Sequence, residues 1–204
     1  MSIPPTTRAT PPLPANIAGA LIEGQARLGR GDLQGAADLA QLVLRNDRRR
    51  PEAWVLLCAA LMRMGSADDD RALGDALASI PVSDPVHSLL AVERCRVLAN
   101  RGRCGEAVEL ARIVSGHVRL APRQHDILSN TYTTCGLFDE ALVHSELAVQ
   151  HLHDDPAAAY NHGLALRHLG RIDEAIECFE TLIRTVPNHA LAYFALSACR
   201  RWTA

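Results

Sequence analysis

Apolar residues recur along most of the chain at intervals of three and four residues, which is the spacing of one helix face. Between residues 156 and 189, Tyr160 and Leu166 follow this spacing, and Phe179 continues it after an interruption. Gly170 lies in the interruption, where glycine ends a helix because it reaches a positive φ without a Cβ clash. This stretch therefore predicts two helices joined by a short turn.

The same pattern repeats with a fixed period. The turn glycines are Gly31, Gly65, Gly102, Gly136 and Gly170, at intervals of 34, 37, 34 and 34 residues. Such a period is typical of an array of helix pairs, each of which buries its apolar face only against its neighbours. The pattern predicts an all-α fold with units at 17–50, 51–87, 88–121, 122–155 and 156–189, followed by a terminal helix at 190–204.

Two segments depart from the period. The interval of 37 residues indicates an insertion at residues 66–70, SADDD, which we expect to lengthen a turn and to place acidic caps before the next helix. Residues 1–16 contain five prolines, which disfavour helix and favour an extended, solvated chain. We expect residues 1–16 to form a disordered tail.

Composition narrows the class of protein. A net charge of −2 and 48% hydrophobic residues fit a folded protein and argue against nucleic acid as a partner. No apolar run reaches the roughly 18 residues of a membrane-spanning helix, and the N-terminus lacks the apolar region of a secretory signal. The six cysteines form no C-x-x-C pair, so we interpret them as small buried side chains in a reducing cytoplasm. Abundant Arg and Ala, with no Lys, are typical of a GC-rich bacterial genome.

The motifs of common enzyme sites are absent from the sequence. It has no phosphate-binding glycine loop, nucleophile elbow or H-E-x-x-H zinc motif. The carboxylate pairs at 139–140 and 173–174 fall at expected helix starts, where we interpret them as caps. The H-x-H-D-D stretch at 151–155 lacks a third metal ligand at the usual spacing, and His144 has no evident partner. The sequence predicts no catalytic, cofactor or metal site.

The repeats resemble the tetratricopeptide repeat, whose pattern is W-x₂-L-G-x₂-Y, then A-x₃-F, then P. The matching residues are Trp54, Leu57, Leu61 and Pro85 in the second unit, Leu128, Tyr132 and Ala141 in the fourth, and Gly163, Leu166, Ala175, Phe179 and Pro187 in the fifth. A small residue recurs in each first helix, at Gly24, Cys58, Cys95, Ser129, Gly163 and Ser197. The resemblance covers residues 17–204 and implies a right-handed superhelix whose paired helices approach closely at these positions.

The resemblance implies a non-catalytic module that binds a peptide or partner helix in a concave groove lined by the first helices. By repeat position, the groove candidates are Arg96, Arg123, Asp126, Asn130, Tyr160, Arg167, Phe194 and Arg201. Arg and Tyr are enriched at binding hot spots. Family members that capture chaperone C-terminal carboxylates pair Lys with Asn in the groove. This chain has no Lys, so the resemblance does not extend to that ligand.

Two alternatives concern the terminal helix, ALAYFALSACRRWTA, which is rich in aromatic and aliphatic residues. The chain could be the N-terminal recruiting domain of a larger bacterial enzyme, sulfotransferase-like or glycosyltransferase-like, because the segment is similar to the repeat region of bacterial tetratricopeptide–sulfotransferase proteins. It could instead be a self-associating scaffold that forms a homo-dimer through this helix. The sequence leaves both alternatives open.

Overall fold

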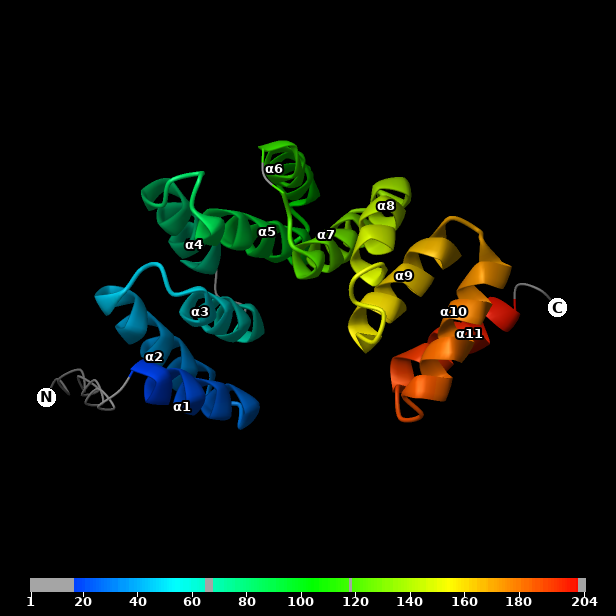
Figure 1. The fold of residues 1–204 in the computed structure, drawn as a ribbon, viewed down its shortest axis with the longest axis horizontal. Helices are drawn as coiled ribbons and strands as arrows, with labels where there is room; N and C mark the ends of the chain where they lie inside the picture. The colour runs from blue at the N-terminus through cyan, green and yellow to red at the C-terminus, as the bar shows by residue number, and fades with distance from the viewer. Residues whose placement is uncertain (1–16, 65–67, 118, 202–204) are drawn as a thin grey trace, which may run out of the picture. The chain divides into compact units, whose positions relative to one another are not determined.

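The computed structural model describes residues 17–64, 68–117 and 119–201, and the regular structure of these residues consists of eleven helices (Figure 1). They are α1 (Ile17–Gly29), α2 (Leu33–Asn46), α3 (Pro51–Met64), α4 (Asp68–Ser79), α5 (Pro85–Asn100), α6 (Cys104–His117), α7 (Pro122–Thr134), α8 (Phe138–Val149), α9 (Pro156–His168), α10 (Ile172–Thr185) and α11 (Ala190–Arg200). The chain divides inside α4 into two compact units, Met1–Asp75 and Ala76–Ala204.

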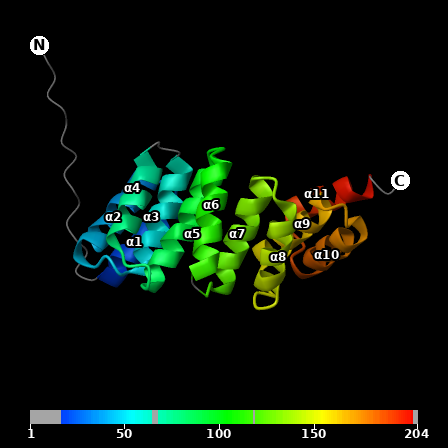
Figure 2. The same ribbon diagram turned by 90° about the horizontal axis from the view of Figure 1, so that it is seen from above.

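In the second unit, each odd-numbered helix packs against the even-numbered helix that follows it and against the next odd-numbered helix. The first kind of contact joins α5 to α6, α7 to α8 and α9 to α10, and the second joins α5 to α7, α7 to α9 and α9 to α11. Figure 2 shows these helices side by side in chain order. The odd-numbered helices therefore form one layer and the even-numbered helices lie on it. In the first unit, α1 packs in the same way against α2 and α3.

Glycine ends the first helix of a pair, as the sequence predicts. Gly31, Gly102, Gly136 and Gly170 have φ values of 83°, 74°, 77° and 76°, while Gly65 lies outside the described residues. After Gly170, the backbone N–H of Arg171 donates to the carbonyl of Leu166 at 3.0 Å. This bond occupies a carbonyl that the helix end leaves without an intrahelical donor, so the chain can reverse sharply.

Prolines begin four of the odd-numbered helices, at Pro51, Pro85, Pro122 and Pro156. Proline suits the first helical position because the N–H it lacks would have no acceptor there and its φ is already helical. The repeat pattern assigns Pro85 to the close of the second unit, but Pro85 begins α5, three residues before the expected start at residue 88. The side chain of Asp84 accepts a hydrogen bond from the N–H of Val86 at 2.9 Å and fixes this start.

The acidic residues at helix starts act differently from the caps that we expected. The pairs at 139–140 and 173–174 lie in the first turns of α8 and α10, but neither helix has a side-chain cap hydrogen bond. Glu174 instead pairs with Arg171 at 2.6 Å. Helix α4 begins at Asp68, so residues 68–70, the last three of the insertion, belong to the helix rather than to the turn. Residues 66 and 67 lie outside the described residues.

Small residues bring paired helices close together. Gly24, Cys58, Cys95, Ser129 and Gly163 are buried, as the repeat pattern predicts. Ser197 is exposed, because α11 contacts only α9 and α10 within the described residues and no second helix covers this position. At Gly163 the ring of Phe179 occupies the place of a side chain, and Phe179 is fully buried.

Gly163→Ala is expected to lower the free energy of unfolding by about 1–3 kcal/mol, the usual cost of overpacking. The added Cβ would lie 2.6 Å from Cε1 of Phe179, whose buried ring has no room to retreat. Urea denaturation measures the change. Gly116→Ala is the matched control, because a Cβ there meets no atom within 4 Å. Equal losses in the two variants would contradict this account of the helix contact.

Candidate functional site

The eight predicted site residues all belong to the second unit, and seven of them lie on its odd-numbered helices. Arg96 lies on α5, three candidates lie on α7, two on α9 and Phe194 on α11, while Arg201 follows α11 as its C-cap residue. Because the odd-numbered helices contact one another in sequence, residues on successive first helices become neighbours. The structure brings Arg96, Arg123 and Asp126 together, and it keeps Arg167, Phe194 and Arg201 apart from them.

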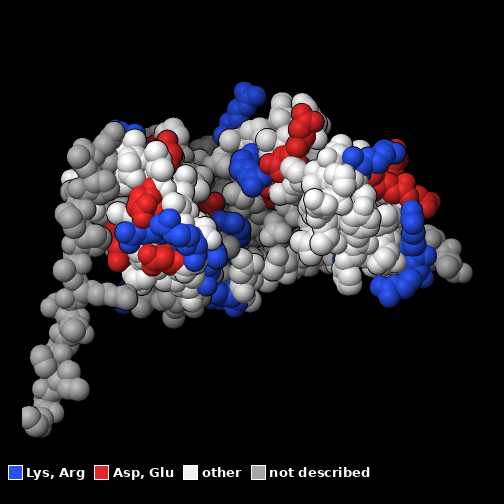
Figure 3. All heavy atoms as spheres, turned by 90° about the horizontal axis from the view of Figure 1, so that it is seen from below, with Lys and Arg blue, Asp and Glu red and all other residues white. Residues whose placement is uncertain are grey.

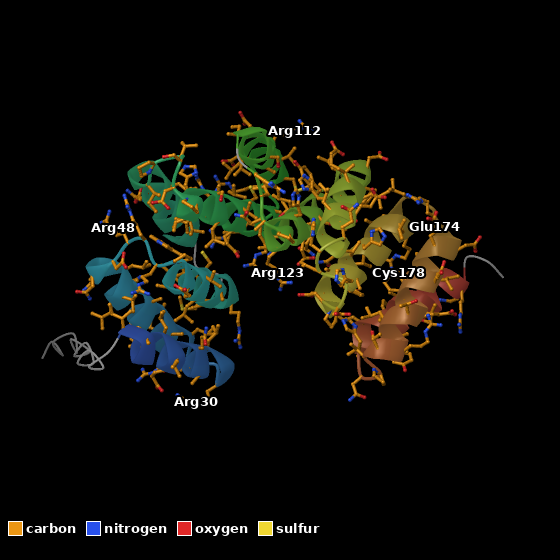
Figure 4. All side chains as sticks on the ribbon, in the orientation of Figure 1. Arg30, Arg48, Arg112, Arg123, Glu174 and Cys178 are labelled. Atoms are coloured by element: carbon orange, nitrogen blue, oxygen red, sulfur yellow. The ribbon has the colours of Figure 1, made fainter. Side chains whose placement is uncertain are left out.

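A network of ionic and amide groups links α7 to α9. Nη1 of Arg123 lies 2.9 Å from Oδ2 of Asp155 and 3.2 Å from Oδ2 of Asp126. Nδ2 of Asn161 donates to the other oxygen of Asp126 at 2.8 Å. Figure 4 shows Arg123 on the side of α7 opposite α6. Two of these three contacts therefore join α7 to α9 and its N-cap residue Asp155, while the pair of Arg123 and Asp126 lies within α7.

Helix α5 adds a second arginine beside this network. The guanidinium of Arg96 donates to the carboxylate of Glu93, whose side chain is only 6% exposed. We call the whole set the charged cluster, and its members are Glu93, Arg96, Arg123, Asp126, Asp155 and Asn161. The repeat pattern did not point to Glu93, Asp155 and Asn161, because a period identifies equivalent positions but not which neighbouring side chains meet.

The electrostatics of the charged cluster follow from burial. Burial raises the pKa of the Asp126 carboxyl, while the hydrogen bond from Asn161 and the charges of Arg123 and Arg96 act in the opposite direction. The carboxylate of Asp126 is 6% exposed, whereas the side chain of Arg123 is 57% exposed. The cluster therefore keeps the carboxylates of Glu93 and Asp126 inside and presents the guanidinium group of Arg123 to solvent. Such donors suit a carboxylate or a backbone carbonyl.

The other candidates surround the charged cluster or lie away from it. Asn130 is half-buried one turn after Asp126, and its side-chain amide has no hydrogen-bond partner in the part of the chain that the structure describes. The ring of Tyr160 packs against Phe179 and His189, with centroid separations of 5.9 and 5.4 Å. Phe194 is 66% exposed. Tyr160 thus supports the core, while Asn130 and Phe194 keep groups available for binding.

His144 has a partner that the sequence analysis did not anticipate. Its Nδ1 lies 2.8 Å from Nδ1 of His125, and its ring stacks on Tyr132 with a centroid separation of 5.3 Å. One ring must donate and the other must accept, so the two rings cannot both be protonated. Burial, and then the charge of His125, lower the pKa of His144 to about 4. The pair joins α7 to α8.

The H-x-H-D-D stretch serves the helix that follows it. Asp155 accepts hydrogen bonds from the N–H groups of Ala157 and Ala158 at 2.8 and 3.2 Å, which caps α9, and it also pairs with Arg123. Within residues 17–64, 68–117 and 119–201, no three His, Cys, Asp or Glu side chains are placed to hold a metal ion. None of the helices described is long and apolar enough to cross a membrane.

Charges of opposite sign lie next to one another on the surface. Arg103 pairs with Glu106 and Arg171 with Glu174, at equivalent places in α6 and α10, and Arg200 pairs with Glu180. Figure 3 shows basic and acidic side chains interspersed on the face in view.

Comparison with known proteins identifies the repeats. Residues 22–87 and 145–201, more than half of the chain, match the family model described as the tetratricopeptide repeat. No curated protein matches the chain significantly in sequence. Three solved structures of similar fold have TM-scores between 0.56 and 0.72 and identities of 16–17%.

The first of these is a thermophilic tetratricopeptide repeat protein of Thermus thermophilus, with a TM-score of 0.68 and 17% identity over 90% of this chain and 98% of that one. The second is the Cut9–Hcn1 hetero-tetramer of the APC/C, with a TM-score of 0.72 and 16% identity over 92% of this chain and 37% of that one. The third is YrrB, with a TM-score of 0.56 and 16% identity over 88% and 91%. These matches confirm the predicted all-α array of helix pairs.

The stability of the fold is expected to fall between about pH 6.5 and pH 4 because of His144. A histidine whose pKa is depressed by folding contributes stability above its unfolded pKa and loses it as the pH falls toward the folded pKa. For a half-buried ring we expect a loss of about 1–2 kcal/mol. Urea denaturation at several pH values should show a shallower slope for His144→Gln than for the exposed control His153→Gln. Identical slopes would contradict the role of the histidine pair.

Proposed function

The chain belongs to the tetratricopeptide repeat family, and we propose that it is a non-catalytic interaction module that binds a peptide or helix of a protein partner on its odd-numbered helices. The family fold supports a role in protein interaction or scaffolding. The proposed binding site on the odd-numbered helices rests on the charged cluster. This cluster holds two arginines on adjoining first helices, near the free amide of Asn130.

The proposed ligand is an extended or helical segment with an acidic group. Exposed guanidinium groups donate hydrogen bonds to carboxylates, and the amide of Asn130 can pair with the backbone of an extended peptide. Phe194 offers an apolar contact on α11. YrrB, which shares the fold at 16% identity, is described as having an unusual peptide-binding site, and this supports the capacity of the fold to carry one.

We also propose that the module works in the cytoplasm, without a cofactor. The support for this location is that all six cysteines are thiols in the described structure, which suits a reducing compartment. The alternative of a recruiting domain within a larger enzyme stays a prediction.

The double variant Asn130→Ala and Phe194→Ser is expected to capture at least about tenfold less partner protein than the wild type, which is the effect of losing one hot-spot contact. Neither side chain is committed to a hydrogen bond or to the core, so the variant should fold normally. Immobilised protein would capture partners from a lysate of the source organism, with quantification by mass spectrometry. Val143→Ser and Arg184→Ala, which change exposed residues on α8 and α10, form the control. An unchanged partner set in the double variant, with equal circular dichroism spectra, would overturn the proposal.

A second candidate function is self-association through α11. Leu191, Tyr193 and Phe194 are 59%, 49% and 66% exposed on this one helix. Neighbouring exposed apolar side chains of this kind mark interaction surfaces, and a two-fold pair of α11 helices would cover them on both copies.

Self-association predicts that the apparent mass in light scattering doubles as protein concentration rises into the micromolar range. Leu191→Ser combined with Tyr193→Ser should keep the chain monomeric, because it removes most of the apolar surface that the dimer would bury. Val143→Ser, an equally apolar exposed site on α8, should leave the dimer intact. A monomer at every concentration tested would exclude the dimer.

A further inference from the structure

Two cysteines from consecutive helix pairs line the same cavity in the second unit. Cys104 is the first residue of α6, and Cys135 is the C-cap residue of α7. Both line one open cavity of about 660 Å³, together with Val108, Arg112 and Leu137. The side chains of both cysteines are partly exposed, so a small molecule in solution can reach either sulfur.

The two thiols lie close enough to influence each other. Cys104 contributes to the raised pKa of the Cys135 thiol, and Cys135 also packs against Leu98, Ala99 and Ala107. A disulfide requires the sulfur atoms to approach to about 2.05 Å, so both side chains would turn toward each other within the cavity that they line. Cys95 lies nearby, but it is fully buried and closed to solvent.

We propose that Cys104 and Cys135 form a reversible disulfide when the protein meets a hydroperoxide. The proposal rests on the cavity that both thiols line and on the packing of α6 against α7, which brings the two cysteines near each other. It is independent of the ligand that the odd-numbered helices bind.

The positions of the two sulfurs assign their roles in the reaction. Burial and the neighbouring sulfur raise the pKa of the Cys135 thiol to about 12, so Cys135 keeps its proton at neutral pH. Cys104 is the first residue of α6 and lines the open cavity, where a peroxide can reach its sulfur. Cys104 is therefore the sulfur that attacks the peroxide, and Cys135 is the sulfur that resolves the product.

The proposed reaction balances in two steps. The Cys104 thiolate attacks one peroxide oxygen, the O–O bond breaks, and Cys104 becomes a sulfenic acid while hydroxide or alkoxide leaves and takes up a proton. The Cys135 sulfur then attacks the Cys104 sulfur, the S–O bond breaks, and hydroxide departs as water with the proton of Cys135. Two thiols lose two electrons in total, and hydrogen peroxide is reduced to two molecules of water.

The disulfide would tie α6, the second helix of one pair, to α7, the first helix of the next pair. Helix α7 carries Arg123, Asp126 and Asn130, so oxidation would fix part of the proposed binding surface against its neighbour. Reduction by a thiol would release it.

The test treats the reduced full-length protein with hydrogen peroxide and measures its intact mass and its peptide map. We expect a mass lower by about 2 Da, a linked peptide that contains Cys104 and Cys135, and reversal by dithiothreitol. Cys104→Ser and Cys135→Ser should each abolish the linked peptide. The control Cys178→Ser should retain it, because Cys178 lies between α9 and α10 and donates to the carbonyl of Ala159 at 3.3 Å (Figure 4).

A second measurement on the wild-type chain guards against a variant that fails to fold. At neutral pH, iodoacetamide should label Cys104 before oxidation and spare it afterwards. Oxidation products that carry added oxygen without a linked peptide would overturn the proposal. A link to another cysteine or between two chains would overturn it as well.

Discussion

The packing of this fold depends on how closely neighbouring helices can approach each other. At Gly163 the aromatic ring of Phe179 fills the space where a Cβ would lie, and at Gly24 the side chain of Leu56 does the same. When two helices lie this close, the apolar residues of each are buried directly against the other helix. The turn glycines contribute to the same constraint, because a left-handed residue after the first helix lets the second helix return along it without a long loop.

Close packing of the odd-numbered helices explains why charged residues are found between them. Glu93 and Asp126 are nearly buried, and a buried carboxylate is tolerated only with partners. Arg96, Arg123 and Asn161 supply those partners from the same helix or the next one. Ion pairs of this kind add little net stability, since desolvation offsets most of the attraction. Their stronger effect is on specificity, because only one register of the helices satisfies every group.

The sequence predicted the features that repeat and failed on those that occur once. The glycine turns and the buried small residues follow the period, so the pattern along the chain was enough to place them. Pro85 was misplaced because a proline between two helices satisfies the rule for ending one and the rule for starting the next. Ser197 was expected to be buried because its position matches Gly163, yet burial depends on a second helix that no described residue provides.

The same reasoning explains why the polar chemistry of the second unit was the least predictable part. Consecutive residues at the start of α7 reach three different neighbours. Gln124 donates to the buried Ser88 of α5 at 3.1 Å, His125 meets His144 of α8, and Asp126 accepts from Asn161 of α9. Cys135, at the other end of α7, lines a cavity together with Cys104 of α6.

Helix α7 is therefore held by specific polar contacts on every side, where the other first helices rely more on apolar packing. Its sequence, PRQHDILSNTYTT, has few large apolar residues, and several of its polar side chains are buried nonetheless. Polar contacts are directional, so a helix fixed in this way has one preferred position, whereas apolar contacts tolerate sliding. A ligand that engages Arg123 and Asn130 and a disulfide that forms at Cys135 would both act on this single helix. The physical link between the two proposed sites is therefore the rigidity of α7 itself.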